Sequence, residues 1–215
     1  NQLKYFYSDN ILNLNQFISS LNFHNVNFLR NSFSFFKCND YQGEAVKLFI
    51  SGDRSSVGKS TTCQYLLASF IYYGISPHDI AYIKPITQCE AEQSVVKYCN
   101  EQGIECMGIG PVVFYKGFTR AFLEGTTNTS EELLESVKKA VDDISRGKKI
   151  VIIDGVGYPA VGSICGVSNA DSAKVLNSPV LIVSKSGVGD AVDSFNLNAS
   201  FFQLKNVTVI GAIMV

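Results

Sequence analysis

The sequence has no concentration of positive charge. Its 18 Lys and Arg residues face 19 Asp and Glu residues, so the formal net charge is −1 at pH 7. Proteins that bind nucleic acid or an anionic membrane surface present a basic cluster, and this chain contains none. We therefore expect no nucleic acid among the partners. No apolar run is longer than a strand, so we also expect no membrane span.

The cysteines lack the spacing of a disulfide framework or a metal site. No C-x-x-C pair occurs among the six, which stand at Cys38, Cys63, Cys89, Cys99, Cys106 and Cys165. Free thiols in a reducing compartment are the expected state. No signal peptide accompanies the glycosylation triplets at Asn128, Asn198 and Asn206, which we ascribe to the Asn-rich composition.

The chain begins with Asn1 rather than Met, from which we expect that a segment has been removed. We expect a cytoplasmic protein; the alternative is the mitochondrial matrix after removal of a transit peptide. With 215 residues, 46% of them hydrophobic, the chain can bury a full core. This length suits one α/β domain plus an appendage.

One glycine-containing segment joins an apolar run to a helical pattern. The run at 48–50 precedes Gly52, and five residues separate Gly52 from Gly58-Lys59-Ser60-Thr61. Apolar residues then recur at helical spacing as far as Gly74, at Leu66, Leu67, Phe70 and Ile71. A strand, a loop and a helix in this order are typical of a phosphate-binding loop. The spacing is one residue longer than the general Walker A pattern, and a subset of P-loop proteins shares it.

Such a loop binds phosphate through its backbone. Glycines let N–H groups surround the phosphate oxygens, and the helix N-terminus adds positive potential. Lys59 would reach the β- and γ-phosphates, and the Ser60 hydroxyl would ligate Mg²⁺. We therefore predict ATP and Mg²⁺ as cofactors, with the nucleotide bound by Gly52, Ser55, Ser56, Val57, Gly58, Lys59, Ser60 and Thr61. The alternative is an ordinary glycine-containing surface turn.

From Val46 onward, apolar strands alternate with helical patterns. The expected strands span 46–51, 80–84, 149–153, 179–184 and 207–214. Ser130 is the expected cap of a helix that ends at Gly147, and Ser168 caps another with Asp171 in the capping-box position. The alternation predicts an α/β fold with a doubly wound, mostly parallel sheet of the P-loop NTPase type.

Ligands of such sheets bind outside the carboxyl ends of the strands. The loops at 51–60, 84–90, 154–168 and 184–190 should therefore converge on one site. Lys84 follows a strand and could stabilise transferred phosphoryl charge. Asp154 follows another and could hold Mg²⁺ in the Walker B role. Taken singly, Lys84 could be a solvated loop lysine, Asp154 a turn residue and Asp190 a helix N-cap.

Residues 1–45 are crowded with Asn and Phe and read as an N-terminal extension of a domain at 46–215. Ser8 or Asp9 could cap a helix with one apolar face, made by Ile11, Leu14, Ile18 and Leu21. The later Phe23, Phe28, Phe33 and Phe35 look like anchors in an extended segment. This extension would pack on the main domain or dock a partner chain, in a homodimer or a larger assembly.

Taken together, the motifs resemble the dethiobiotin synthetase family. This branch of P-loop enzymes is grouped with the cobyrinate and cobyrate amide synthases and the N-terminal domain of some phosphotransacetylases. The resemblance covers residues 46–215 and rests on Gly52-x5-Gly58-Lys59-Ser60, Tyr82-Ile-Lys84-Pro85-Ile86, Asp154-Gly-Val-Gly157, Ser178-Pro179 with the strand after it, Gly187-Val-Gly189 and Val209-Ile-Gly-Ala-Ile.

The resemblance implies an enzyme that uses ATP and Mg²⁺ to phosphorylate a carbamate, formed from diaminopelargonate and CO₂, before ring closure. Lys59 and Lys84 would be catalytic and would stabilise the phosphoryl group and the carbamate. Ser60 and Asp154 would bind the metal. In the family an Asn beyond the position of Val215 reads the base, so the domain is expected to lack its C-terminal end.

The substrate loops depart from the family's pattern. The Asp and Glu of its P-loop are replaced by Arg54 and Ser56, although Asp53 lies adjacent. Its small hydroxyl residue and Gly after Lys-Pro are Gln88 and Cys89, and the final Gly of Glu-Gly-x-Gly-Gly is Tyr158. The family also has a further metal-ligating Asp. It has no clear equivalent in this chain, where Glu90 or Glu92 could take its place.

We predict an ATP·Mg-binding P-loop protein that activates a carboxylate or carbamate, a reaction of the ligase or cyclo-ligase type. Its partners would be the nucleotide and a small carboxylate or amine substrate. The alternative is a non-catalytic family member that serves as a structural or regulatory subunit. Gln88, Cys89 and Tyr158 favour this alternative, whereas the intact P-loop, Lys84 and Asp154 favour the enzyme.

Overall fold

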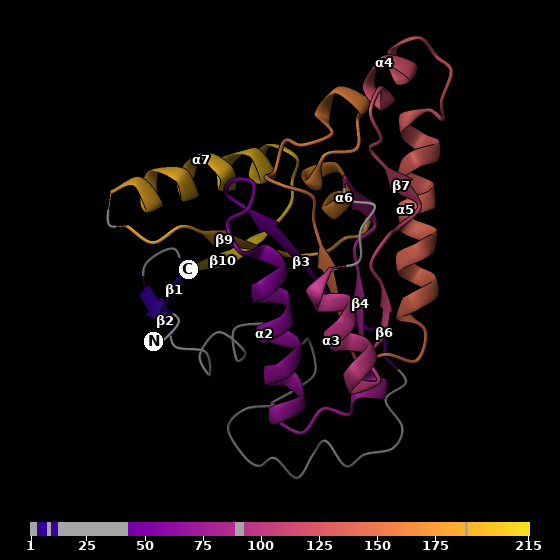
Figure 1. The fold of residues 1–215 in the computed structure, drawn as a ribbon. Coiled ribbons are helices and arrows are strands. Elements are labelled where there is room, and N and C mark those ends of the chain that lie inside the picture. Colours follow the sequence, from indigo (N-terminus) through magenta and orange to yellow (C-terminus); the bar gives the residue numbers. More distant parts are fainter. Residues whose placement is uncertain (1–3, 8–9, 13–42, 89–92, 188) are drawn as a thin grey trace.

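The computed structural model describes residues 4–7, 10–12, 43–88, 93–187 and 189–215. An eight-stranded sheet forms its centre (Figure 1). Six strands run parallel in the order β10-β9-β3-β8-β4-β6, which confirms the expected doubly wound, mostly parallel sheet. They are β3 (Val46–Gly52), β4 (Ile80–Ile83), β6 (Glu105–Met107), β8 (Ile150–Asp154), β9 (Val180–Ser184) and β10 (Val209–Met214). Of these, only β6 was not expected from the sequence.

Two strands of the N-terminal extension complete the sheet. β1 (Lys4–Tyr7) pairs antiparallel with β10, and β2 (Asn10–Leu12) pairs with β1. Ile11 is therefore in a strand opposite Phe6, and the helix expected to start at Ser8 or Asp9 is wrong at this point. β10 would otherwise be an edge with unpaired backbone groups, and β1 satisfies them. The rest of that expected helix and the four phenylalanine anchors lie outside the described residues.

Helices cover both faces of the sheet. The α-helices are α2 (Lys59–Tyr72), α3 (Ser94–Gln102), α4 (Phe118–Leu123), α5 (Ser130–Ser145), α6 (Asn169–Val175) and α7 (Asp190–Leu204). Short 3-10 helices η2 (Pro77–Asp79) and η3 (Ser163–Cys165) and a two-stranded parallel sheet of β5 (Ile86–Thr87) and β7 (Val112–Val113) lie in the connections. Within the described residues, no helix is long and apolar enough to cross a membrane.

Successive residues of each central strand point to opposite faces. Leu48 and Ile50 of β3 pack in one apolar cluster with residues of α2 and α3. Phe49 packs in a second cluster with residues of α5, α6 and α7. Figure 1 shows α2 and α3 side by side over one face of the sheet. The two clusters explain why the central strands carry apolar residues on both faces.

α5 begins one residue earlier than expected. Thr129, not Ser130, is the N-cap, and it forms a reciprocal capping box with Glu132. Ser130 instead donates a hydrogen bond to the carbonyl oxygen of Cys165 at 2.9 Å. The helix ends at Ser145, before Gly147. At α6, the expected capping box of Ser168 and Asp171 is confirmed.

Candidate functional site

The loop between β3 and α2 requires glycine at both ends. A Cβ atom at Gly52 would lie 2.7 Å from the carbonyl oxygen of Arg54 and 2.9 Å from that of Gly157. Gly58 has a φ of 101°, a left-handed conformation that residues with a side chain rarely adopt. These constraints explain the two glycines that the sequence pattern singles out. The loop therefore folds tightly over the carboxyl end of β3.

The start of α2 offers unpaired backbone donors. No side chain caps this helix, whose N-cap residue is Gly58. Within the described residues, no acceptor takes a hydrogen bond from the backbone N–H groups of residues 55–60. The first N–H groups of a helix lack partners inside the helix, and the helix dipole adds positive potential there. This end of α2 can therefore bind an anion.

Three donors converge on one oxygen of Asp154 at the carboxyl end of β8. Its Oδ2 atom accepts hydrogen bonds from Ser60 Oγ at 3.1 Å, from Tyr82 OH at 2.9 Å and from Lys84 Nζ at 3.2 Å. Asp154 is fully buried, and its Oδ1 atom has no partner within the described residues. Gln93 joins the group, because its Oε1 atom lies 3.4 Å from Ser60 Oγ and 3.5 Å from Lys84 Nζ.

Burial governs the ionisation of two groups beside this carboxylate. Desolvation raises the pKa of the Tyr82 hydroxyl well above its ordinary value, and the negative charge of Asp154 raises it further. Desolvation and Asp154 also raise the pKa of the Cys63 thiol, and together they outweigh the opposing effect of Lys59 and Lys84. Tyr82 and Cys63 are therefore neutral at pH 7, and Tyr82 remains a hydrogen-bond donor.

The residues around Asp154 fit Mg²⁺. A buried carboxylate oxygen that has no partner among the described residues and a serine hydroxyl supply the oxygen ligands that this ion prefers. The described residues contain no group of three or more His, Cys, Asp or Glu side chains that could hold a metal by themselves. A site of this kind suits Mg²⁺ held by one or two protein oxygens together with nucleotide phosphates and water.

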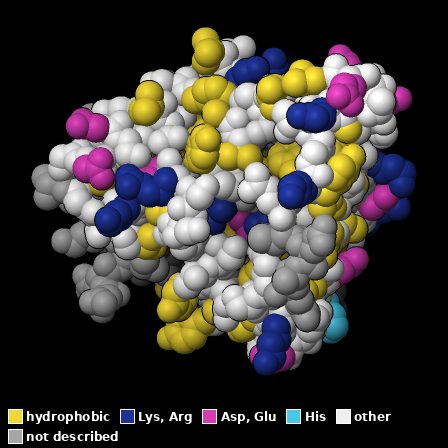
Figure 2. Space-filling model, turned by 45° about the horizontal axis from the view of Figure 1, so that its top comes forward, with side chains coloured by type: hydrophobic (Ala, Val, Ile, Leu, Met, Phe, Trp, Pro, Cys, Tyr) yellow, Lys and Arg dark blue, Asp and Glu magenta, His cyan; other side chains and the backbone are white. Residues whose placement is uncertain are grey.

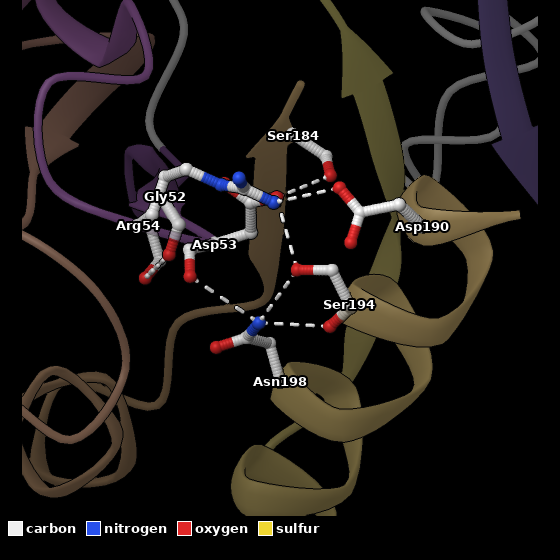
Figure 3. Close-up of polar contacts among 8 residues, drawn as sticks. Gly52, Asp53, Arg54, Ser184, Asp190, Ser194 and Asn198 are labelled. Carbon is white, nitrogen blue, oxygen red and sulfur yellow. Dashed lines mark hydrogen bonds and ion pairs between the residues drawn. The ribbon is translucent and has the colours of Figure 1, made fainter. Parts of the chain in front are cut away.

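A second polar group joins the P-loop to α7 (Figure 3). The buried Asp53 carboxylate accepts hydrogen bonds from Ser184 Oγ at 2.6 Å and Ser194 Oγ at 3.0 Å. Arg54 pairs with Asp53 at 3.3 Å and with Asp190, at the start of α7, at 3.4 Å. Burial raises the pKa of Asp53, but hydrogen bonds from Ser184, Arg54 and Ser194 outweigh it and hold the pKa below its ordinary value.

The expected loops therefore do converge. Lys59 is 8% exposed, and Lys84 lies beside Asp154. Ser55, Ser56 and Thr61 are exposed on the loop and on the first turn of α2. Cys89, Glu90 and Glu92 lie outside the described residues. Figure 2, which brings this side forward, shows basic, acidic and hydrophobic side chains interspersed on the surface.

The sequence patterns indicated no role for Tyr82, for Gln93 or for Ser194 of α7, which is hydrogen-bonded to Asp53. Tyr82 lies two residues before Lys84 in a strand that is otherwise aliphatic, and this spacing puts both side chains on one face. That spacing is a signal from which its contact with Asp154 could have been inferred. The contacts of Asp53 with Ser194 span 141 residues and carry no comparable local pattern.

A pocket of about 260 Å³ lies beside the loop that follows β8. Among the described residues, none that line it carries a charge; they are Gln88, Phe114, Tyr115, Gly117, Phe118, Thr119, Val161, Gly162, Ile164 and Cys165. A Cβ atom at Gly157 would lie 2.9 Å from Val161 Cγ2 and 3.4 Å from Ser55 Oγ. Gly157 therefore lies between the wall of this pocket and the P-loop.

One protein family matches most of the chain. Its model, described as an AAA domain, matches residues 46–215. No curated protein matches the chain. The division of the chain at residue 45 remains a prediction.

Solved structures resemble this chain at low sequence identity. The chimerical protein CapA2B2 is 12% identical with a TM-score of 0.55, over 85% of this chain and 79% of that one. The signal recognition particle receptor FtsY from Elizabethkingia anophelis, in complex with GDP, is 16% identical with a TM-score of 0.46, over 78% and 48%. A plasmid partition protein from Borrelia burgdorferi is 16% identical with a TM-score of 0.44, over 76% and 75%.

Proposed function

Because the chain belongs to the AAA domain family (AAA_26), we propose that it binds Mg·ATP at residues 52–61 and uses it to activate a small carboxylate or carbamate. One observation carries this proposal: Ser60 and Lys84 meet on the buried Asp154 carboxylate beside the uncapped start of α2. A phosphate group, a divalent cation and a catalytic cation would each find suitable partners there.

The triphosphate would be held mainly by the backbone. The N–H groups of residues 55–60 would surround its oxygens, and Lys59 would neutralise the β- and γ-phosphates. Mg²⁺ would be held by Ser60 and by Asp154, whose Oδ1 atom has no hydrogen-bond partner among the described residues. When bound, the ion neutralises charge on the phosphate oxygens. Ser60 can donate its hydrogen to Asp154 and keep its lone pairs for the metal.

Lys84 would act in the transfer step. As the acceptor oxygen bonds to the γ-phosphorus and the bond to the ADP oxygen breaks, negative charge accumulates on the transferred group. An ammonium group held in a largely buried position stabilises that charge more than a solvated one does. Lys84 is 7% exposed and is held by Asp154 and Gln93, so it is already oriented.

The uncharged pocket supports an acceptor site next to the P-loop. Its volume of about 260 Å³ is near the lower end for small-molecule sites. Because the described residues of its lining carry no charge, the carboxylate or carbamate of the acceptor would face Lys84 and the uncharged remainder would occupy the pocket. This arrangement suits diaminopelargonate poorly, since that molecule carries amines and a carboxylate at its two ends.

Calorimetric titration with Mg·ATP tests the nucleotide site. Lys59→Ala should weaken binding more than tenfold, because each hydrogen bond to a charged group contributes about 1.5–3 kcal/mol. Lys97→Ala, which removes an exposed lysine from α3, is the matched control and should bind as the unaltered protein does. Equal affinities of the Lys59→Ala variant and the control would refute the assignment.

A further inference from the structure

Tyr82 and Lys84 approach Asp154 from the same strand face. They stand two residues apart at the carboxyl end of β4, which pairs in parallel with β8 through Ile83 and Ile153. Asp154 is the next residue of β8. Its Oδ2 atom lies 2.9 Å from the Tyr82 hydroxyl and 3.2 Å from Lys84 Nζ. The Tyr82 hydroxyl thus contacts the carboxylate from within the core, whereas Lys84 contacts it from the residue that follows the end of β4.

Tyr82 is the only polar residue in β4, whose other members are Ile80, Ala81 and Ile83. Its side chain is fully buried in the apolar cluster beneath α2 and α3. A buried hydroxyl requires a hydrogen-bond partner, and the one described for Tyr82 is Asp154. Asp154 is therefore the hydrogen-bond partner that the structure describes for Tyr82.

The other two donors have alternative partners. Ser60 and Lys84 also lie within hydrogen-bond distance of Gln93, and in the proposed function both would bind metal or phosphate. When Mg·nucleotide binds, Ser60 would also ligate the metal and Lys84 would also face phosphate, so neither residue would serve Asp154 alone. The hydroxyl of Tyr82 is the donor that keeps its place, because the core that surrounds it is closely packed.

We propose that Tyr82 is a positioning residue that fixes the orientation of the Asp154 carboxylate. The Oδ2 atom is hydrogen-bonded to the Tyr82 hydroxyl, and the Oδ1 atom is left for the metal. This inference rests on the proposed function, because it concerns the metal site of the same nucleotide complex. It gives Tyr82 a role that its burial in an apolar cluster would otherwise conceal. Partners that orient metal ligands in this way typically contribute 10- to 100-fold to metal affinity.

Tyr82→Phe tests the inference, since it removes one oxygen and keeps the ring. ADP is titrated by calorimetry in excess EDTA and again across a series of Mg²⁺ concentrations. We expect ADP affinity in EDTA to stay within twofold of that of the unaltered protein. The Mg²⁺ concentration that gives half of the increase in ADP affinity should rise about tenfold. Tyr98→Phe, in a half-buried position of α3, is the matched control and should leave both values unchanged.

Two results would overturn the inference. One is an unchanged Mg²⁺ dependence in Tyr82→Phe; the other is an equal loss of ADP affinity with and without Mg²⁺, which would indicate a general packing role. If the unaltered protein binds no ADP under any condition, the proposed function fails and this inference fails with it. Mg²⁺-dependent binding that is unchanged by Tyr82→Phe refutes this inference alone.

If Tyr82→Phe does not fold, the unaltered protein labelled with ¹³C at tyrosine Cζ replaces it. The Cζ chemical shift reports hydrogen bonding of the phenol. The Tyr82 resonance should move when Mg·ADP is added and stay in place when ADP is added with EDTA. A resonance that does not move with Mg·ADP, although calorimetry shows that the complex forms, would contradict the inference.

Discussion

Replacement of Asp53 by alanine should destabilise the fold through the contact between the P-loop and α7. The carboxylate is fully buried and accepts hydrogen bonds from Ser184 and Ser194 at 2.6 and 3.0 Å. Two hydrogen bonds to a charged group, at about 1.5 kcal/mol each, give a loss of about 3 kcal/mol in the free energy of unfolding. The ion pair with Arg54 adds little to this loss, because the Arg54 side chain is 42% exposed and solvent screens the pair.

Urea unfolding followed by circular dichroism measures this loss. In a domain of this length, 3 kcal/mol corresponds to a decrease in Tm of about 6–12 °C. Asp190→Ala is the matched control, because its carboxylate is 78% exposed and contacts the same Arg54. It should cost less than about 1 kcal/mol. If Asp53→Ala were no less stable than Asp190→Ala, the assignment of Asp53 as the buried link between the P-loop and α7 would be wrong.

The same carboxylate predicts a pH dependence. Burial raises the pKa of Asp53, but its hydrogen bonds dominate and hold that pKa below the ordinary value of 3.8. A group whose pKa is lowered by folding stabilises the folded state above its unfolded pKa and loses that contribution as pH falls through the folded pKa. The difference in unfolding free energy between the unaltered protein and Asp53→Ala should therefore be full at pH 7 and smaller below pH ~4. A difference that grows on acidification would contradict this sign.

The remaining predictions concern the metal, the transfer step and the substrate. Asp154→Asn should weaken nucleotide binding only when Mg²⁺ is present, whereas Lys84→Ala should leave binding nearly intact and slow any turnover of ATP; identical effects of the two substitutions would show that their roles are not separate. Formation of dethiobiotin from diaminopelargonate, bicarbonate and Mg·ATP should be undetectable or very slow, because a mismatch of polar partners can reduce rates by factors of about 10⁴. Turnover near 1 s⁻¹, within the ordinary enzyme range, would contradict this prediction and indicate that the protein synthesises dethiobiotin.

Most residues of the candidate site could be predicted from the sequence, because each of its motifs is local. Lys59, Lys84 and Asp154 each follow an apolar run, and in a parallel sheet the carboxyl ends of all strands lie on one side. Their proximity therefore required no knowledge of helix positions. The structure brings Lys84 and Asp154 together at 3.2 Å, as that reasoning predicts. Their chemical roles remain predictions.

Local patterns failed where a distant element decided the outcome. The spacing of Ile11 predicted a helix, but Ile11 pairs with Phe6 of β1, and Phe6 pairs in turn with Ala212 of β10 at the other end of the chain. The helix cap was misplaced for a different reason. Thr129 and Ser130 are both good caps, and only Thr129 has a Glu three residues later, the feature that completes a capping box.

A crystal structure of the protein grown with Mg²⁺ and ADP would show directly whether the start of α2 binds phosphate. We expect the β-phosphate to lie among the backbone N–H groups of residues 55–60 and Lys59 to contact it. The metal should be bonded to Ser60 Oγ and should lie near Asp154 Oδ1, directly or through one water. A nucleotide bound elsewhere, with no phosphate at the start of α2, would contradict the account.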